Sequence, residues 1–90
     1  MKIELNQTFL SDIRKLRNPK LKNKIADFLE FLKKIDNISE ISHFRKLSGH
    51  DTAYRIRLGD YRLGVYLIGD TIVLSRFLHR KDIYNFFPLL

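Results

Sequence analysis

The sequence contains no cysteine and no tryptophan, only two prolines and four glycines, and no apolar run longer than four residues. The absence of cysteine excludes a disulfide scaffold, a thiolate zinc site and a thiol nucleophile. The longest apolar run, residues 65–68, is far too short for a transmembrane helix. No secretory signal is visible, because Lys2 is followed by residues that alternate in polarity. We therefore expect a cytoplasmic protein without a membrane segment.

A chain of 90 residues, 44% of them hydrophobic and 30% charged, predicts one globular domain over residues 1–90. Seventeen Lys and Arg residues face ten Asp and Glu residues, which gives a formal net charge of +7. This excess favours a polyanionic partner, either nucleic acid or an acidic protein. Both halves of the chain share the excess, so the arrangement of the charges has to indicate the function.

The N-terminal half predicts a strand and two helices. Residues 1–6 alternate in polarity like a strand, and Asn6 or Thr8 can cap a first helix that ends before Asn18-Pro19. The second helix has the clearest period of 3.6 residues, with an apolar stripe of Leu21, Ile25, Phe28, Leu29, Leu32 and Ile35. A basic amphipathic helix can also lie on a membrane surface, but a stripe of six residues favours packing in a core. The short break between the helices predicts a helical hairpin.

The C-terminal half changes to a period of two. Three runs, residues 54–58, 61–68 and 71–78, are separated by Gly59-Asp60 and Gly69-Asp70, which predicts two tight β-hairpins. Residues 36–51 are interpreted as irregular and residues 81–90 as a short tail. The expected fold is α+β: an N-terminal strand and a helical hairpin packed on one face of a mainly antiparallel sheet that ends in a three-strand meander.

Two-residue turns would set the register of this meander. Arg57 would then face Arg62, Arg55 would face Gly64, and Gly64 would face Ser75. One sheet face would carry mainly apolar residues, Leu78 among them. Arg76 would be the one charged residue on that face. The opposite face, which we call the arginine face, is expected to carry Arg55, Arg57, Arg62, Gly64, Tyr66, Val73, Ser75, Phe77 and His79.

The arginine face indicates a binding surface. Like charges directly across a sheet are destabilising, so Arg57 opposite Arg62 calls for an anion between them. Gly64 would leave a floor that a ligand backbone can approach, with Tyr66 and Phe77 as stacking surfaces. Arginines interleaved with aromatic residues are typical of single-stranded nucleic-acid binding. The alternative is a solvated sheet face whose arginines fan apart.

Other chemistry is scarce in the sequence. The three histidines lack ligand spacing, no GxSxG surrounds Ser75, and no P-loop is present. We therefore expect no metal and no cofactor. Arginine, tyrosine and histidine suit cleavage of RNA by its own 2′-hydroxyl, because the substrate supplies the nucleophile.

Three segments carry a family resemblance. Residues 46–50 (KLSGH), 54–64 (YRIRLGDYRLG) and 79–84 (HRKDIY) resemble the RelE/ParE superfamily of toxins from type II toxin–antitoxin modules. The resemblance implies a RelE fold and neutralisation by a cognate acidic antitoxin. For the RelE branch it implies an endoribonuclease that cleaves mRNA on the ribosome, inhibits translation and uses no metal.

The resemblance also implies roles for single residues. Arg62 matches the arginine that holds the scissile phosphate, and Tyr84 matches a C-terminal tyrosine that stacks on a base or assists proton transfer. A further family arginine, about six residues before that tyrosine, falls on Leu78, so His79 or Arg80 is expected to replace it. The expected catalytic residues are Arg62, Arg57, Tyr84 and His79, and the expected RNA-binding residues are Arg55, Arg57, Arg80, Lys81 and Lys46.

Two other functions remain open within the same superfamily. One is a ParE-like inhibitor that binds DNA gyrase and performs no RNA chemistry, and the other is an inactive relative that binds only its antitoxin. ParE members generally lack the full set of basic residues and tyrosine, so Arg57, Arg62 and Tyr84 together favour the RelE reading.

Overall fold

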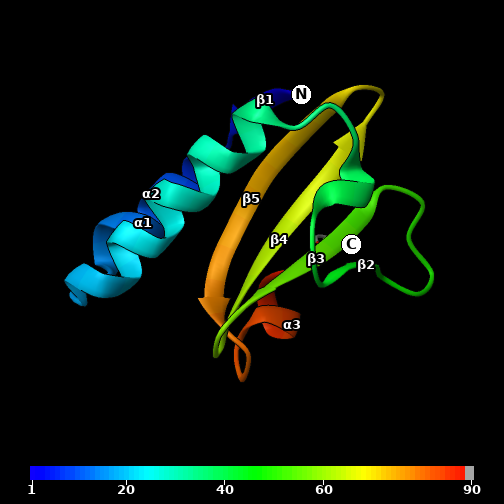
Figure 1. Ribbon diagram of the computed structural model, residues 1–90. Helices are drawn as coiled ribbons and strands as arrows, with labels where there is room; N and C mark the ends of the chain where they lie inside the picture. The colour runs from blue at the N-terminus through cyan, green and yellow to red at the C-terminus, as the bar shows by residue number, and fades with distance from the viewer. Residues whose placement is uncertain (89–90) are drawn as a thin grey trace.

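The computed structural model describes residues 1–88, in which two long helices lie on one face of a five-stranded sheet and a short helix on the other (Figure 1). The elements are β1 (Lys2–Leu5), α1 (Gln7–Lys15), α2 (Pro19–Lys34), the 3-10 helix η1 (Ile38–Glu40), β2 (Phe44–Lys46), β3 (Ala53–Leu58), β4 (Tyr61–Ile68), β5 (Thr71–His79) and α3 (Ile83–Phe86). The strand order is β1-β5-β4-β3-β2, with β1 parallel to β5 and the other pairs antiparallel. The predicted α+β class is confirmed.

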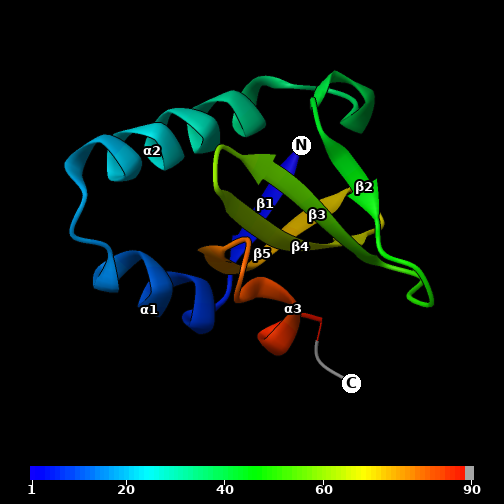
Figure 2. The same cartoon turned by 90° about the horizontal axis from the view of Figure 1, so that it is seen from below.

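The sequence did not predict three short elements. Strand β2 and helix η1 form in the segment interpreted as irregular, and α3 forms in the tail. Strand β2 is only three residues long and exists because it pairs with β3 across a loop, a contact that local periodicity does not report. Helix α3 lies on the sheet face opposite α1 and α2 (Figure 2), so the helices do not all share one face as expected.

The helical hairpin forms as predicted. The Asn18 side chain accepts hydrogen bonds from the backbone N–H groups of Lys20 and Leu21, and Pro19 occupies the first turn of α2. The stripe of α2 packs on the sheet through the buried side chains of Ile25 and Leu32. Within residues 1–88 no helix has the length and apolar character needed to cross a membrane.

The β3–β4 hairpin has the predicted register. Gly59 takes a positive φ of 61° in the two-residue turn, a conformation that costs glycine little. Arg57 is paired with Arg62, and Arg55 with Gly64.

The β4–β5 hairpin departs from the prediction at a β-bulge. Tyr66 faces Val73 as expected, but the register shifts between Gly64 and Val65, so Gly64 faces Arg76 and Ser75 is the extra residue. Beyond the bulge each β5 side chain lies on the face opposite to the expected one. The prediction was therefore wrong for four residues: Arg76 and Leu78 lie on the arginine face, while Phe77 and His79 lie on the helix side.

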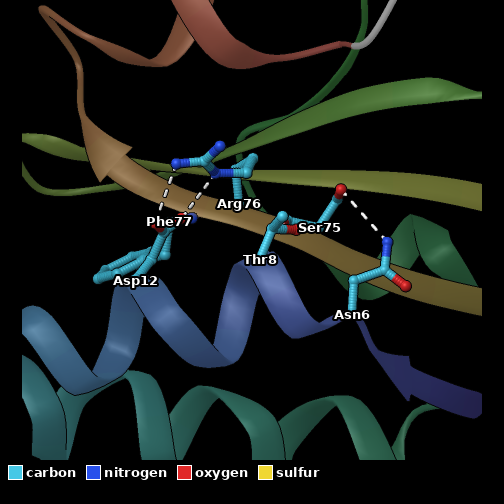
Figure 3. A network of polar contacts seen from close by, with 6 residues as sticks. All are labelled: Asn6, Thr8, Asp12, Ser75, Arg76 and Phe77. Atoms are coloured by element: carbon cyan, nitrogen blue, oxygen red, sulfur yellow. Dashed lines mark hydrogen bonds and ion pairs between the residues drawn. The ribbon is translucent and has the colours of Figure 1, made fainter.

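Helix α1 gives the physical reason for the bulge. Strand β1 ends at Leu5, and beyond it α1 supplies the hydrogen bonds for the edge of β5 (Figure 3). The Thr8 hydroxyl donates to the carbonyl of Ser75 at 2.6 Å, and the Asp12 carboxylate accepts from the backbone N–H of Phe77 at 2.9 Å. Phe77 is then buried in the core and stacks on Tyr61, with ring centroids 5.1 Å apart.

Candidate active site

Two opposed arginines form the centre of the candidate site. Arg57 is exposed on β3 and Arg62 is half-buried at the start of β4. Nη1 of Arg62 donates to the carbonyls of Gly59 and Tyr61, each at 3.0 Å. These bonds fix the guanidinium against the β3–β4 turn. Among residues 1–88 no acceptor binds its Nε and Nη2, the edge that makes bidentate contacts with phosphate.

The electrostatics identify the neighbours of Arg62. Partial burial, then the positive charges of Arg55 and Arg57, lower the pKa of Arg62, and Arg80 adds to this effect. Tyr84 acts in the opposite direction and raises the pKa of Arg62. Four cations and one tyrosine therefore converge on one end of the arginine face, where a bound anion would relieve their repulsion.

The C-terminal segment places Tyr84 at this site. Ile83 and Phe87 on either side of it are buried against the arginine face, in a small cluster with Ala53. Tyr84 itself points outward and is 56% exposed. Its ring is therefore accessible for stacking.

Gly64 is not a floor for a ligand backbone, and that prediction was wrong. A Cβ at Gly64 would lie 2.6 Å from Cγ of Phe87, so the ring of Phe87 already occupies the space. Tyr66 packs on the same ring, with centroids 5.1 Å apart. A glycine inside a strand does indicate a close approach here, but the approaching group belongs to the chain itself.

An open groove of about 480 Å³ runs beside Tyr84. It is lined by His50, Arg76, Tyr84, Asn85, Phe86, Phe87 and Pro88. Arg76 forms a bidentate ion pair with the buried Asp12, at 2.8 and 3.0 Å (Figure 3). Its guanidinium carbon also lies 5.2 Å from the ring centre of Phe86. The pair ties α1 to the wall of this groove.

Several predicted site residues lie elsewhere. His79 is on the helix side of the sheet, where its ring meets Tyr61 edge-on and its Nδ1 accepts from the N–H of Lys81. The expected placement of His79 on the arginine face was wrong because of the bulge at Ser75. Lys46 is paired with Tyr54, on the side of the sheet away from Arg55. Lys81 is exposed in the turn after β5.

The structure adds two arginines that the sequence reasoning missed. Arg45 faces Arg55 across β2 and β3, and Arg76 faces Gly64 across β4 and β5. Their placement depends on the short strand β2 and on the bulge. The one available signal was Arg76 itself, a charge on a strand face predicted to be otherwise apolar.

The part of the chain that the structure describes, residues 1–88, contains no group of three or more His, Cys, Asp or Glu side chains arranged to hold a metal ion. The arginine face itself presents the guanidinium groups of Arg55, Arg57 and Arg62, with the phenol of Tyr84 beside them.

Comparison with known proteins shows the family to which the chain belongs. Residues 3–84 match the family model described as ParE toxin of type II toxin-antitoxin system, parDE. The chain therefore belongs to this toxin family, within the RelE/ParE superfamily. Toxin RelE3 of Methanocaldococcus jannaschii is 34% identical over 89 residues, which cover 98% of this chain and 100% of that protein. The putative toxin RelE1 of the same organism is 31% identical over 81 residues and 89% of each chain.

Solved structures agree with this assignment. The antitoxin–toxin complex RelB–RelE from Methanococcus jannaschii contains a chain with a TM-score of 0.80 and 32% identity, over 94% of this chain and 99% of that one. The RelBE complex of E. coli gives a TM-score of 0.65 at 20% identity, over 87% of this chain and 94% of that one, which shows the fold. The chain is a type II toxin–antitoxin toxin of RelE type.

Proposed function

We propose that this toxin is a ribosome-dependent mRNA endoribonuclease that works by metal-independent 2′-hydroxyl transesterification. The observation that carries the proposal is the fixed guanidinium of Arg62, anchored through Nη1 with its Nε–Nη2 edge open, directly opposite Arg57. Such a pair can hold one phosphate whose negative charge grows during the reaction. The resemblance to RelE toxins supports mRNA on the ribosome as the substrate.

In the proposed reaction the 2′-oxygen of one nucleotide attacks its own 3′-phosphorus and the bond to the next 5′-oxygen breaks. The products are a 2′,3′-cyclic phosphate and a 5′-hydroxyl end. Arg62 and Arg57 neutralise the charge on the phosphoryl oxygens. The Tyr84 hydroxyl gives a proton to the leaving 5′-oxygen, and the 2′-hydroxyl proton passes to water. Arginine remains protonated at accessible pH and therefore acts as an electrostatic group, not as the base.

We also propose that an acidic antitoxin of RelB type binds this toxin, as the RelB–RelE complex of a 32% identical chain suggests. The opposed arginines and the net charge of +7 favour a partner that brings carboxylates. Steering by these charges would make association faster at low salt.

The test is cleavage of mRNA on programmed ribosomes by the purified toxin, with the ends of the products mapped. A 2′,3′-cyclic phosphate on the upstream fragment supports the proposal. Intact mRNA together with an early DNA-damage response in cells would contradict it and favour the gyrase-binding alternative. Intact mRNA without a DNA-damage response, with antitoxin binding retained, would favour an inactive relative.

A further inference from the structure

Six of the seventeen basic residues of the chain lie in one short segment outside the arginine face. Residues 14–24, which we call the basic turn, contain six basic residues and no acidic residue, whereas the whole chain has a net charge of +7. The segment is the end of α1, the connection and the first turns of α2. Its basic residues are all exposed: Arg14, Lys15, Arg17, Lys20, Lys22 and Lys24.

Nothing within the described chain neutralises this charge. The ion pairs of residues 1–88 are Lys2–Asp70, Lys33–Glu30 and Arg76–Asp12, and none of them involves the basic turn. The first turn of α2 has no acidic residue, although the positive end of a helix dipole favours acidic residues there. Lys20 and Lys22 therefore lie at the end of α2 that disfavours positive charge, whereas Arg14 and Lys15 lie in the last turn of α1, where the dipole favours it. The unfavourable placement at the start of α2 is typical of positions that serve binding.

The basic turn adjoins the candidate active site. The connection between α1 and α2 lies at the same end of the molecule as the β3–β4 turn (Figures 1 and 2). Nζ of Lys24 lies 3.3 Å from the point where a Cβ on Gly59 would be. The carbonyl of Gly59 in turn holds Arg62. One partner can therefore contact both surfaces.

The composition of the basic turn indicates the kind of partner. It contains no aromatic residue, so it offers no platform on which single-stranded bases can stack. Its two leucines, Leu16 and Leu21, are packed against the core, so it also lacks the exposed apolar anchors of a protein interface. What remains is a set of point charges suited to a dense array of phosphates. Double-helical RNA presents such an array and is recognised mainly through its backbone.

We propose that the basic turn is a second RNA-binding surface, which binds the phosphate backbone of double-helical RNA while the arginine face acts on a single strand. This proposal rests on the proposed function only in taking RNA as the partner class. The proposal predicts that the basic turn determines the affinity for structured RNA, while the arginine face carries out the reaction.

The test compares two triple variants with the same loss of charge. Arg17→Gln/Lys20→Gln/Lys22→Gln changes the basic turn, and Lys2→Gln/Lys33→Gln/Lys34→Gln changes exposed lysines elsewhere. The probe is a labelled RNA duplex of about 20 base pairs, with affinity measured over a series of KCl concentrations. Binding of the antitoxin to each variant provides a separate readout.

We expect the basic-turn variant to lose at least about tenfold in duplex affinity at low salt. Log affinity decreases as log salt increases, and this dependence should become shallower in the basic-turn variant. The magnitude of the slope should decrease by about 2 to 3, on the order of one per lost phosphate contact. The control variant should lose less than about threefold. Equal losses in both variants would mean that only net charge matters and would overturn the proposal. So would unchanged duplex affinity, or a loss confined to antitoxin binding. None of these readouts depends on cleavage, so a failure of the proposed nuclease activity would be seen separately.

Discussion

The ring of Phe87 lies directly against Gly64, so closely that a Cβ added to the glycine would be 2.6 Å from Cγ and 2.7 Å from Cδ2 of the ring. The contact seals the C-terminal segment onto the arginine face and holds α3, which carries Tyr84. Gly64 is thus required by the packing of the chain itself.

Gly64→Ala should therefore destabilise the fold by about 1–3 kcal/mol, the range for overpacking a well-packed site. The measurement is urea unfolding of Gly64→Ala, Phe87→Leu and the double variant. Because the smaller leucine leaves space for the new methyl group, the double variant should lose less than the sum of the single losses. Strict additivity would mean that the two residues do not meet.

The ion pair between Asp12 and Arg76 should contribute more to stability than the exposed pairs. The Asp12 side chain is 3% exposed, and it also accepts from the backbone N–H of Phe77. Asp12→Ala leaves the guanidinium and this N–H without their acceptor, so we expect a loss of about 3 kcal/mol in the free energy of unfolding. Glu30→Ala breaks the exposed pair with Lys33 and should cost less than about 1 kcal/mol. Similar losses in both variants would contradict the assigned role of Asp12.

The core face of α2 can be tested at two neighbouring positions. Leu32 is fully buried and Lys33 is exposed. Leu32→Ala should cost roughly 2–5 kcal/mol in urea unfolding, and Lys33→Ala about 0.5 kcal/mol or less. Leu29→Ala should fall between them because Leu29 is half-buried. An equal cost at positions 32 and 33 would show that the helix face is wrongly assigned.

The extent to which the sequence predicted the site depends on how locally each feature is determined. The register of Arg57 and Arg62 followed from a two-residue turn that contains Gly59, which is a local signal. The bulge at Ser75 has no such signal, because contacts from Thr8 and Asp12 more than 60 residues away accompany it. One extra residue was enough to reverse the sides of the remaining β5 residues.

The same distinction explains the other differences. Strand β2 is a long-range pairing of three residues, and α3 is held by buried contacts of Ile83 and Phe87 with the sheet. Periodicity reports which face of an element is apolar, but it does not report which distant segment covers that face. Arg55, Arg57 and Arg62 were therefore found from the sequence, while Arg45, the face of Arg76 and the aromatic cover over Gly64 were not.

The opposed arginines should make the free toxin less stable than it could be. Burial, and after it the positive charges of Arg55 and Arg57, lower the pKa of Arg62 in the folded state. Its charged form therefore costs stability at every pH below that pKa, and the cost is relieved only as the pH rises through it. Arg57→Gln should then stabilise the free toxin by about 0.2–1 kcal/mol at low salt. The gain should shrink in about 1 M NaCl, where charges are screened over roughly 3 Å. Lys34→Gln serves as the control, and a greater loss of stability in Arg57→Gln than in this control would contradict the repulsion.

The most direct test of the central claim is single-turnover cleavage of mRNA on programmed ribosomes by the wild-type toxin and by Arg62→Ala. If Arg62 holds the scissile phosphate, its removal should lower the rate by about 10²–10³ while substrate binding changes less. Arg62→Lys should restore only part of the activity, because a point charge does not reproduce bidentate contact, and Lys34→Ala should cleave like the wild type. Full activity in Arg62→Ala, with its fold shown to be intact, would contradict the assignment of the site.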